Sequence, residues 1–136
     1  MKRFFFEDQF DVDERFNISY TDKIRIQKAM HTLPRKAKYD PETYYDSYVK
    51  FFMYGDSKDT IPDHVKIYNK VGYAYGTLTE TAYIVDEKEG IRFLLSATIL
   101  VNKNGVFNDD TYEYDTVGIP FLAQLGREMY DLEKSR

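Results

Sequence analysis

The fold is decided by residues 65–101, which read VKIYNKVGYAYGTLTETAYIVDEKEGIRFLLSATILV. Apolar residues recur at every second position at the start of this stretch, a spacing typical of a strand with one buried face. The charged segment 86–90 ends in Gly90, which can adopt a left-handed conformation in a tight turn between antiparallel strands. We therefore predict three strands joined as a meander, over about residues 65–73, 77–85 and 91–101.

The third predicted strand differs from the other two in composition. Residues 91–101 are almost continuously apolar, as strands buried on both faces are, so we expect both faces to be covered. Its edge should also be paired, because an apolar strand with an open edge invites pairing with another chain. The candidate partners are the N-terminal segment 2–10, a missing N-terminal half of the protein, and a second copy in a homodimer.

Two helices are predicted before the strands. The first covers residues 20–33, where apolar residues recur at helical spacing until Pro34 ends the pattern. The second begins with Asp40 as its N-cap and Pro41 in its first turn, and should end near Gly55. Its predicted apolar stripe consists of Tyr45, Tyr48, Val49 and Phe52.

The chain is predicted to close with a long helix over residues 116–134, which has leucine and methionine along one face. Residues 1–18 lack a regular period and are interpreted as an N-terminal arm. No linker divides residues 19–136, which we interpret as a single domain. The predicted fold class is α+β: a three-stranded antiparallel meander with two helices before it and a long C-terminal helix packed on the sheet.

The composition limits the classes of partner. The net charge of −4 argues against nucleic acid, which requires a basic surface, and no window approaches the roughly 18 apolar residues of a membrane span. The sequence contains no cysteine, and its two histidines, His31 and His64, do not have the spacing of a zinc site. We predict no metal and no cofactor.

The first residues, MKRFFF, imitate the start of a signal peptide, but the acidic segment 7–9 interrupts the apolar core that such a peptide requires. The chain as written is therefore not expected to be exported, whereas a longer parent protein could be periplasmic or exported.

A more specific pattern lies between the first two predicted strands. Residues 70–76 read Lys-Val-Gly-Tyr-Ala-Tyr-Gly, or Lys-x-Gly-x-x-Tyr-Gly. This pattern resembles the third signature of the serine β-lactamases and penicillin-recognising serine hydrolases. In that family, helices precede a Lys-(Thr/Ser)-Gly strand, two antiparallel strands follow, and a long helix packs across the sheet. The resemblance extends over residues 18–130 and is specific over residues 66–85.

The resemblance implies a substrate-binding role for Lys70, Val71, Gly72, Tyr73 and Tyr75. Lys70 would attract a substrate carboxylate, and Gly72 would leave room for the substrate beside the strand. The backbone N–H of Tyr73 would be an oxyanion-hole donor. Val71 occupies the position of the family's hydroxyl residue, which disfavours β-lactams as substrates.

The resemblance also places the Ser-x-x-Lys nucleophile motif in an N-terminal half outside this chain. The chain is then a C-terminal fragment of a β-lactamase-like serine hydrolase, with no catalytic residue of its own. One alternative is a non-catalytic module that binds a peptide or carbohydrate along a Tyr-rich strand edge formed by Tyr68, Tyr73 and Tyr75, since tyrosine rings stack while their hydroxyl groups hydrogen-bond. The other is an unrelated α+β interaction domain.

Overall fold

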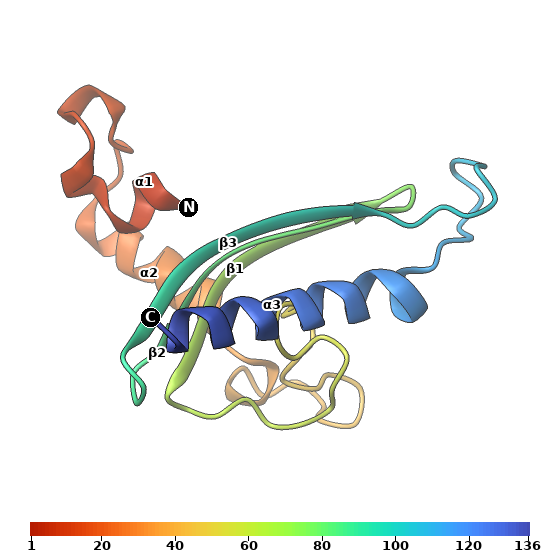
Figure 1. The fold of residues 1–136 in the computed structure, drawn as a ribbon. Coiled ribbons are helices and arrows are strands. Elements are labelled where there is room, and N and C mark those ends of the chain that lie inside the picture. Colours follow the sequence, from red (N-terminus) through yellow and green to blue (C-terminus); the bar gives the residue numbers. More distant parts are fainter.

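The computed structural model describes all 136 residues and contains one three-stranded antiparallel sheet (Figure 1). The strands are β1 (Val65–Ala74), β2 (Thr77–Asp86) and β3 (Ile91–Leu100), in the order β1-β2-β3. The predicted meander and the α+β fold class are confirmed. Tyr75 and Gly76 join β1 to β2 with φ angles of 51° and 84°, as a two-residue hairpin turn with two left-handed positions requires.

The sheet is preceded by two α-helices, α1 (Lys2–Phe5) and α2 (Tyr20–His31). The predicted helix over residues 20–33 is confirmed as α2, and the Ser19 hydroxyl caps it by accepting a hydrogen bond from the Asp22 N–H at 3.1 Å. Short 3₁₀ turns lie between and after them, at Glu7–Gln9, Val12–Glu14 and Pro34–Lys36. None of the helices is both long enough and apolar enough to span a membrane.

The second predicted helix, beginning at Asp40, does not form, and that prediction is wrong. Residues 41–56 form three separate turns, at 41–43, 46–49 and 52–56, and φ is positive at Val49 (54°) and Met53 (69°). The physical reason lies in burial: the four consecutive residues from Lys50 to Met53 are all buried. Four consecutive residues of an α-helix point in directions all around its axis, and a helix packed on a core buries only one face. A helix in this position would therefore expose at least one of these four residues.

The C-terminal helix is confirmed as α3 (Ile119–Lys134), which follows a π-helical turn at Tyr114–Gly118. It lies along the inner side of the bent sheet, and its C-terminal end reaches the β2–β3 turn (Figure 1). The core forms between α3, the 41–62 segment and this face of the sheet. Its largest fully buried apolar side chains are Phe52, Ile61, Leu78, Ile84 and Leu122.

Only one face of β3 is covered, so the prediction that both faces are buried is wrong. Ile91 and Phe93 are buried on the side of α3, while every second residue from Arg92 to Leu100 is exposed on the outer face. The N-terminal arm covers part of the outer face of the sheet on β2 instead, where the Phe5 ring lies 4.8 Å from the Tyr83 ring. The apolar side chains of β3 therefore alternate between a buried face and an exposed face of the sheet.

The N-terminal segment 2–10 does not pair with β3, which corrects one of the three candidate partners for that edge. β3 is hydrogen-bonded to β2 alone within the chain, and the arm packs its phenylalanines on the outer face of β1 and β2, where Phe5 also contacts Tyr68 at 5.1 Å between ring centroids. Within the single chain, the edge of β3 that faces away from β2 has no strand paired with it.

Candidate functional site

A cleft of about 530 Å³ opens where three segments meet: residues 43–55, the far end of the β1–β2 hairpin, and residues 110–119. Aromatic rings and two carboxylates dominate its lining, and no lysine or arginine contributes to it. Its principal side chains are Tyr45, Tyr48, Phe51, Tyr73, Tyr112, Tyr114, Asp110 and Asp115. The cleft combines flat apolar surfaces with hydrogen-bond acceptors and negative charge.

The aromatic wall is built on the β1–β2 hairpin. The Tyr73 ring lies 5.3 Å from the Tyr114 ring and 6.4 Å from the Phe51 ring, both in edge-to-face arrangements, which aromatic pairs prefer. The Tyr114 hydroxyl accepts a hydrogen bond from the Gly76 N–H at 2.7 Å. The hairpin turn thus positions a tyrosine that lies 38 residues later in the sequence.

The floor below the 43–55 segment is a buried polar network on β1 and β2. The Phe52 N–H donates to a Glu80 carboxylate oxygen at 2.6 Å, and the Asn69 amide donates to the other oxygen of Glu80 and to the Val49 carbonyl, the latter at 2.7 Å. Asn69 also accepts from the Lys50 ammonium. Buried backbone groups of the turns are thereby satisfied by side chains of the sheet, as burial demands.

Burial shifts both charged groups of this network toward their neutral forms. It raises the pKa of Glu80 to about 7, against the opposing effect of hydrogen bonds from Phe52 and Asn69 and of the Lys50 charge. Burial lowers the pKa of Lys50 to about 8, and the Glu80 charge partly offsets that change. The network is a structural support whose protonation couples to folding.

Val49 holds a strained backbone conformation at the cleft. Its φ of 54° is a left-handed angle that β-branched residues rarely adopt, and such conformations cost of order 1–3 kcal/mol. A hydrogen bond from the Asn69 amide to the Val49 carbonyl helps to hold this conformation. Strained conformations persist only where the surrounding structure holds them in place, and they are found most often at active sites and ligand-binding sites.

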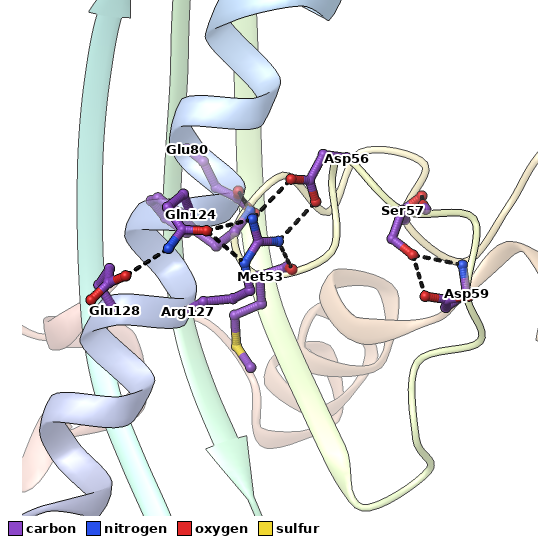
Figure 2. A network of polar contacts seen from close by, with 10 residues as sticks. Met53, Asp56, Ser57, Asp59, Glu80, Gln124, Arg127 and Glu128 are labelled. Atoms are coloured by element: carbon purple, nitrogen blue, oxygen red, sulfur yellow. Dashed lines mark hydrogen bonds and ion pairs between the residues drawn. The ribbon is translucent and has the colours of Figure 1, made fainter.

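The other side of the 43–55 segment is fastened to α3 (Figure 2). Arg127 donates to both carboxylate oxygens of Asp56, at 2.8 and 2.9 Å, and to the Met53 carbonyl at 2.8 Å. These hydrogen bonds hold the pKa of Asp56 below its ordinary value. The Met53 N–H donates to the Ala123 carbonyl of the helix at 3.2 Å. Gly126 permits this approach, since a Cβ there would lie 2.5 Å from the Met53 nitrogen.

The Ser-x-x-Lys pattern lies within this segment, so the expectation that it is outside the chain is wrong: residues 47–50 read Ser-Tyr-Val-Lys. Ser47 is one of the residues that line the cleft, and its hydroxyl donates to the Ser57 carbonyl at 2.6 Å. The Lys50 ammonium donates to the Met30 carbonyl at 2.6 Å and to Asn69. A base must lie within hydrogen-bond reach of the nucleophile it activates, and no hydrogen bond joins these two side chains.

The five residues implied by the family resemblance do not converge on one site. Lys70 and Gly72 lie on the outer face of the sheet, Val71 and Tyr73 alternate onto the α3 side, and Tyr75 is in the hairpin turn. The Lys70 ammonium bonds to the carbonyl of its neighbour, Val71. A Cβ on Gly72 would meet nothing within 4 Å. Their roles in binding substrate stay predictions.

Of the three tyrosines in the alternative hypothesis, Tyr73 alone lines the cleft. Tyr68 is covered on the outer face by the arm and by His31, whose ring lies 4.7 Å away. Sequence reasoning missed Tyr112 and Tyr114, which lie between the third predicted strand and the C-terminal helix, in a stretch where no element was predicted. Their alternation around Glu113 in an otherwise polar stretch was the available signal.

A separate polar cluster involves His64. Its Nδ1 lies 3.0 Å from one carboxylate oxygen of Asp86, whose other oxygen accepts from the Tyr130 hydroxyl at 2.8 Å. Burial and the Asp86 carboxylate raise the pKa of Tyr130. No serine or threonine hydroxyl bonds to this histidine, and the cluster joins the C-terminal part of α3 to the end of β2.

Comparison of the chain with protein-family models, with curated proteins and with solved structures found no match. Within the chain, no group of three or more histidine, aspartate or glutamate side chains has the arrangement of a metal site. The functional argument therefore rests on the geometry and chemistry of the cleft.

Proposed function

We propose that this chain is a non-catalytic binding module whose tyrosine-lined cleft takes a carbohydrate. The observation that carries this proposal is the convergence of five tyrosines and two aspartates from three separate segments on one cleft of about 530 Å³. Its volume is in the range of small-molecule sites, roughly 300–1,000 Å³. A sugar presents both a flat apolar face and several hydroxyl groups.

The chemistry of the lining favours a sugar over an anionic ligand. Tyr73, which is 59% exposed as a residue, offers a ring on which a sugar can stack. Asp110 and Asp115 can accept hydrogen bonds from hydroxyl groups, and the lining itself contains no basic residue to neutralise a carboxylate or phosphate. The Lys58 ammonium lies behind this lining, 4.7 Å from the centroid of the Tyr45 ring. A peptide remains the alternative ligand, and the binding experiment includes one.

The arrangement of Ser47 and Lys50 supports binding rather than hydrolysis. Each group already bonds to a different partner, and the segment that carries them is fastened to β2 and to α3. A β-lactamase-like hydrolase stays a second proposal, resting on the Ser47 pattern in the cleft. Association of chains along the open edge of β3 is a proposal independent of both.

The binding proposal is tested by NMR titration with glucose, mannose and N-acetylglucosamine, and in parallel with a short lysine-containing peptide. We expect saturable shifts at the amides of Tyr73, Tyr112 and Tyr114 with at least one sugar. Tyr73→Ala should weaken that binding at least tenfold, because it removes the stacking surface. The matched control is Tyr20→Ala on α2, an exposed tyrosine that does not line the cleft. Saturation by the peptide alone, or no saturation at all, would contradict a carbohydrate site.

The hydrolase proposal is tested by intact-mass spectrometry after incubation with a penicillin and with a fluorophosphonate. The binding proposal expects an unchanged mass, because the Ser47 hydroxyl donates to the Ser57 carbonyl and not to a base, whereas the hydrolase proposal expects an adduct. A stoichiometric adduct mapped to Ser47, and absent from Ser47→Ala, would establish a nucleophile and replace the binding proposal with the hydrolase.

A further inference from the structure

β3 presents a full row of unpaired backbone groups. The Val101 N–H donates to the Gly76 carbonyl at 2.7 Å, and hydrogen bonds alternate along an antiparallel pair. The odd-numbered residues of β3 therefore bond to β2, while the even-numbered residues direct their N–H and C=O groups away from it. These outward residues are Arg92, Leu94, Ser96, Thr98 and Leu100, and no other segment of the chain bonds to their backbone.

This edge lacks the features by which natural proteins prevent strand pairing. Edge strands are ordinarily short, bulged, or interrupted by lysine or proline. β3 runs for ten residues in unbroken register with β2, and its one charged side chain, Arg92, lies at the start. At about 3.3 Å per residue, it offers an edge roughly 33 Å long.

An apolar stripe on α3 adjoins the same edge. Phe121, Leu125, Met129 and Leu132 recur at helical spacing, on the flank opposite Arg127, which holds the 53–56 loop. Because that loop lies toward β1 and β2, while α3 contacts β3, the stripe lies on the β3 side of the helix, where Leu125 and Met129 are partly buried against the core. Phe121 and Leu132 are 47% and 45% exposed.

We propose that a second copy of this chain pairs antiparallel with β3 around a two-fold axis at Ser96, forming one six-stranded sheet. In this register Ser96 lies opposite the same residue of the second copy, Leu94 opposite Thr98, and Arg92 opposite Leu100. Every outward N–H and C=O group of β3 then gains a partner, as an isologous interface allows.

The same axis brings apolar groups together on the α3 side of the sheet. Leu95 faces Ala97 of the second copy, and Phe93 faces Ile99. All four side chains point to the α3 side, and none of them is fully exposed. Cross-strand pairs of this kind stabilise a sheet, so the register that satisfies the backbone also matches the side chains.

The helix layer shares that axis. Gly118 lies against Val101 at one end of α3, and Lys134 pairs with Glu89 of the β2–β3 turn at the other end, at 3.2 Å. The middle of the helix, near residues 126 and 127, therefore lies roughly level with Ser96. Two antiparallel α3 helices centred there place Phe121 beside Leu132 of the second copy and Leu125 beside Met129. This agreement of strand and helix about one axis is what identifies the partner as a second copy.

The first experiment uses the absence of cysteine from the chain. Ser96→Cys places a single thiol on the axis, where the two Cα atoms of a hydrogen-bonded pair are about 5.5 Å apart, within disulfide range. Oxidation or a short bismaleimide should link most chains into dimers. Thr79→Cys, on the same face but in β2, should stay uncoupled, and equal linkage of both variants would overturn the proposed axis.

The second experiment measures the solution mass by sedimentation at about 100 μM. We expect a dimer for the unmodified chain and monomers for Ser96→Lys and Phe121→Lys, because each variant places like charges across the interface or desolvates a charge. Thr79→Lys and Gln124→Lys, which lie off the interface, should remain dimeric, and circular dichroism checks that all variants fold. A monomeric unmodified chain, or a dimer that survives both interface variants, would overturn the proposal.

Discussion

Glu80 has no exposed surface, yet it carries an ionisable group in the middle of the sheet. Its two oxygens accept hydrogen bonds from Phe52 and Asn69, so the carboxylate holds the strained turn at the base of the cleft to two strands. A network of this kind is costly to break from one side, because the remaining partners stay buried. The pH dependence of stability should therefore report on this residue.

The pKa of Glu80 is raised from 4.5 to about 7 by burial. Between these two values the folded state retains a proton that the unfolded state releases, so the free energy of unfolding should fall as the pH rises from about 4.5 to 7. The pKa of Lys50 is lowered from 10.5 to about 8, so stability should recover as the pH rises from about 8 to 10.5. Together the two groups predict a minimum between pH 7 and 8.

Glu80→Gln should abolish the decline between pH 4.5 and 7, measured as the urea midpoint at each pH. The matched control is Glu128→Gln, an acid on α3 that bonds to Gln124 at the surface. A decline that persists unchanged in Glu80→Gln would show that another group carries it.

The Ser-x-x-Lys pattern at Ser47 and Lys50 shows what residue spacing can and cannot predict. Ser47 and Lys50 have the family's spacing, but that spacing brings two side chains together only on a helix, where residues three apart are neighbours. Here Val49 adopts a left-handed conformation between them, and each side chain bonds to a different partner. The pattern is local, whereas the partners come from α2, β1 and a later loop.

Among the elements, those with a strong local period were predictable. β1, β2, β3, α2 and α3 lie within a few residues of their predicted bounds, since alternation and helical spacing mark them in the sequence. The 41–56 segment was mispredicted because its N-cap and Pro41 are real helix-start signals, and Asp40 indeed caps a turn through Thr43 and Glu42. Tertiary contacts to Glu80 and Arg127 override them, and no local pattern reveals those contacts.

The junction of α3 with this segment depends on one glycine. Gly126→Ala would add a Cβ at 2.5 Å from the Met53 nitrogen and 3.0 Å from the Phe52 backbone. Backbone atoms on both sides cannot give way, so we expect a loss of about 1–3 kcal/mol, despite the roughly 1 kcal/mol that alanine gains over glycine within a helix. Chemical denaturation monitored by circular dichroism measures the difference.

Gly72→Ala is the matched control for that substitution. Its added Cβ meets nothing within 4 Å, and alanine is favoured over glycine in a strand by roughly 0.5–1 kcal/mol, so stability should be unchanged or slightly higher. Equal losses for the two variants would mean that close packing of α3 on the 52–53 backbone is not what requires glycine at position 126.

On the scale of the whole molecule, the two proposed surfaces lie on different parts of the fold. The cleft is formed by the 43–55 segment, the β1–β2 hairpin and the 110–119 segment, whereas the dimer interface comprises the outer edge of β3 and the opposite flank of α3. Neither surface includes a residue of the other. Folding and association, however, are coupled, because partners that bind only the folded chain stabilise it by mass action.

The thermal midpoint of the unmodified chain should therefore rise with protein concentration, by about 2–4 °C for a tenfold increase. Ser96→Lys should abolish this dependence by removing the second copy, while Tyr73→Ala should keep it and lose only sugar binding. Conversely, the Ser96→Lys monomer should bind sugar with unchanged affinity, since its cleft is intact. Calorimetry at two concentrations, with and without sugar, separates the cases. A thermal midpoint that does not depend on protein concentration would contradict the dimer proposal but not the carbohydrate-binding proposal. A concentration dependence that is lost in Tyr73→Ala would show that the two surfaces are coupled.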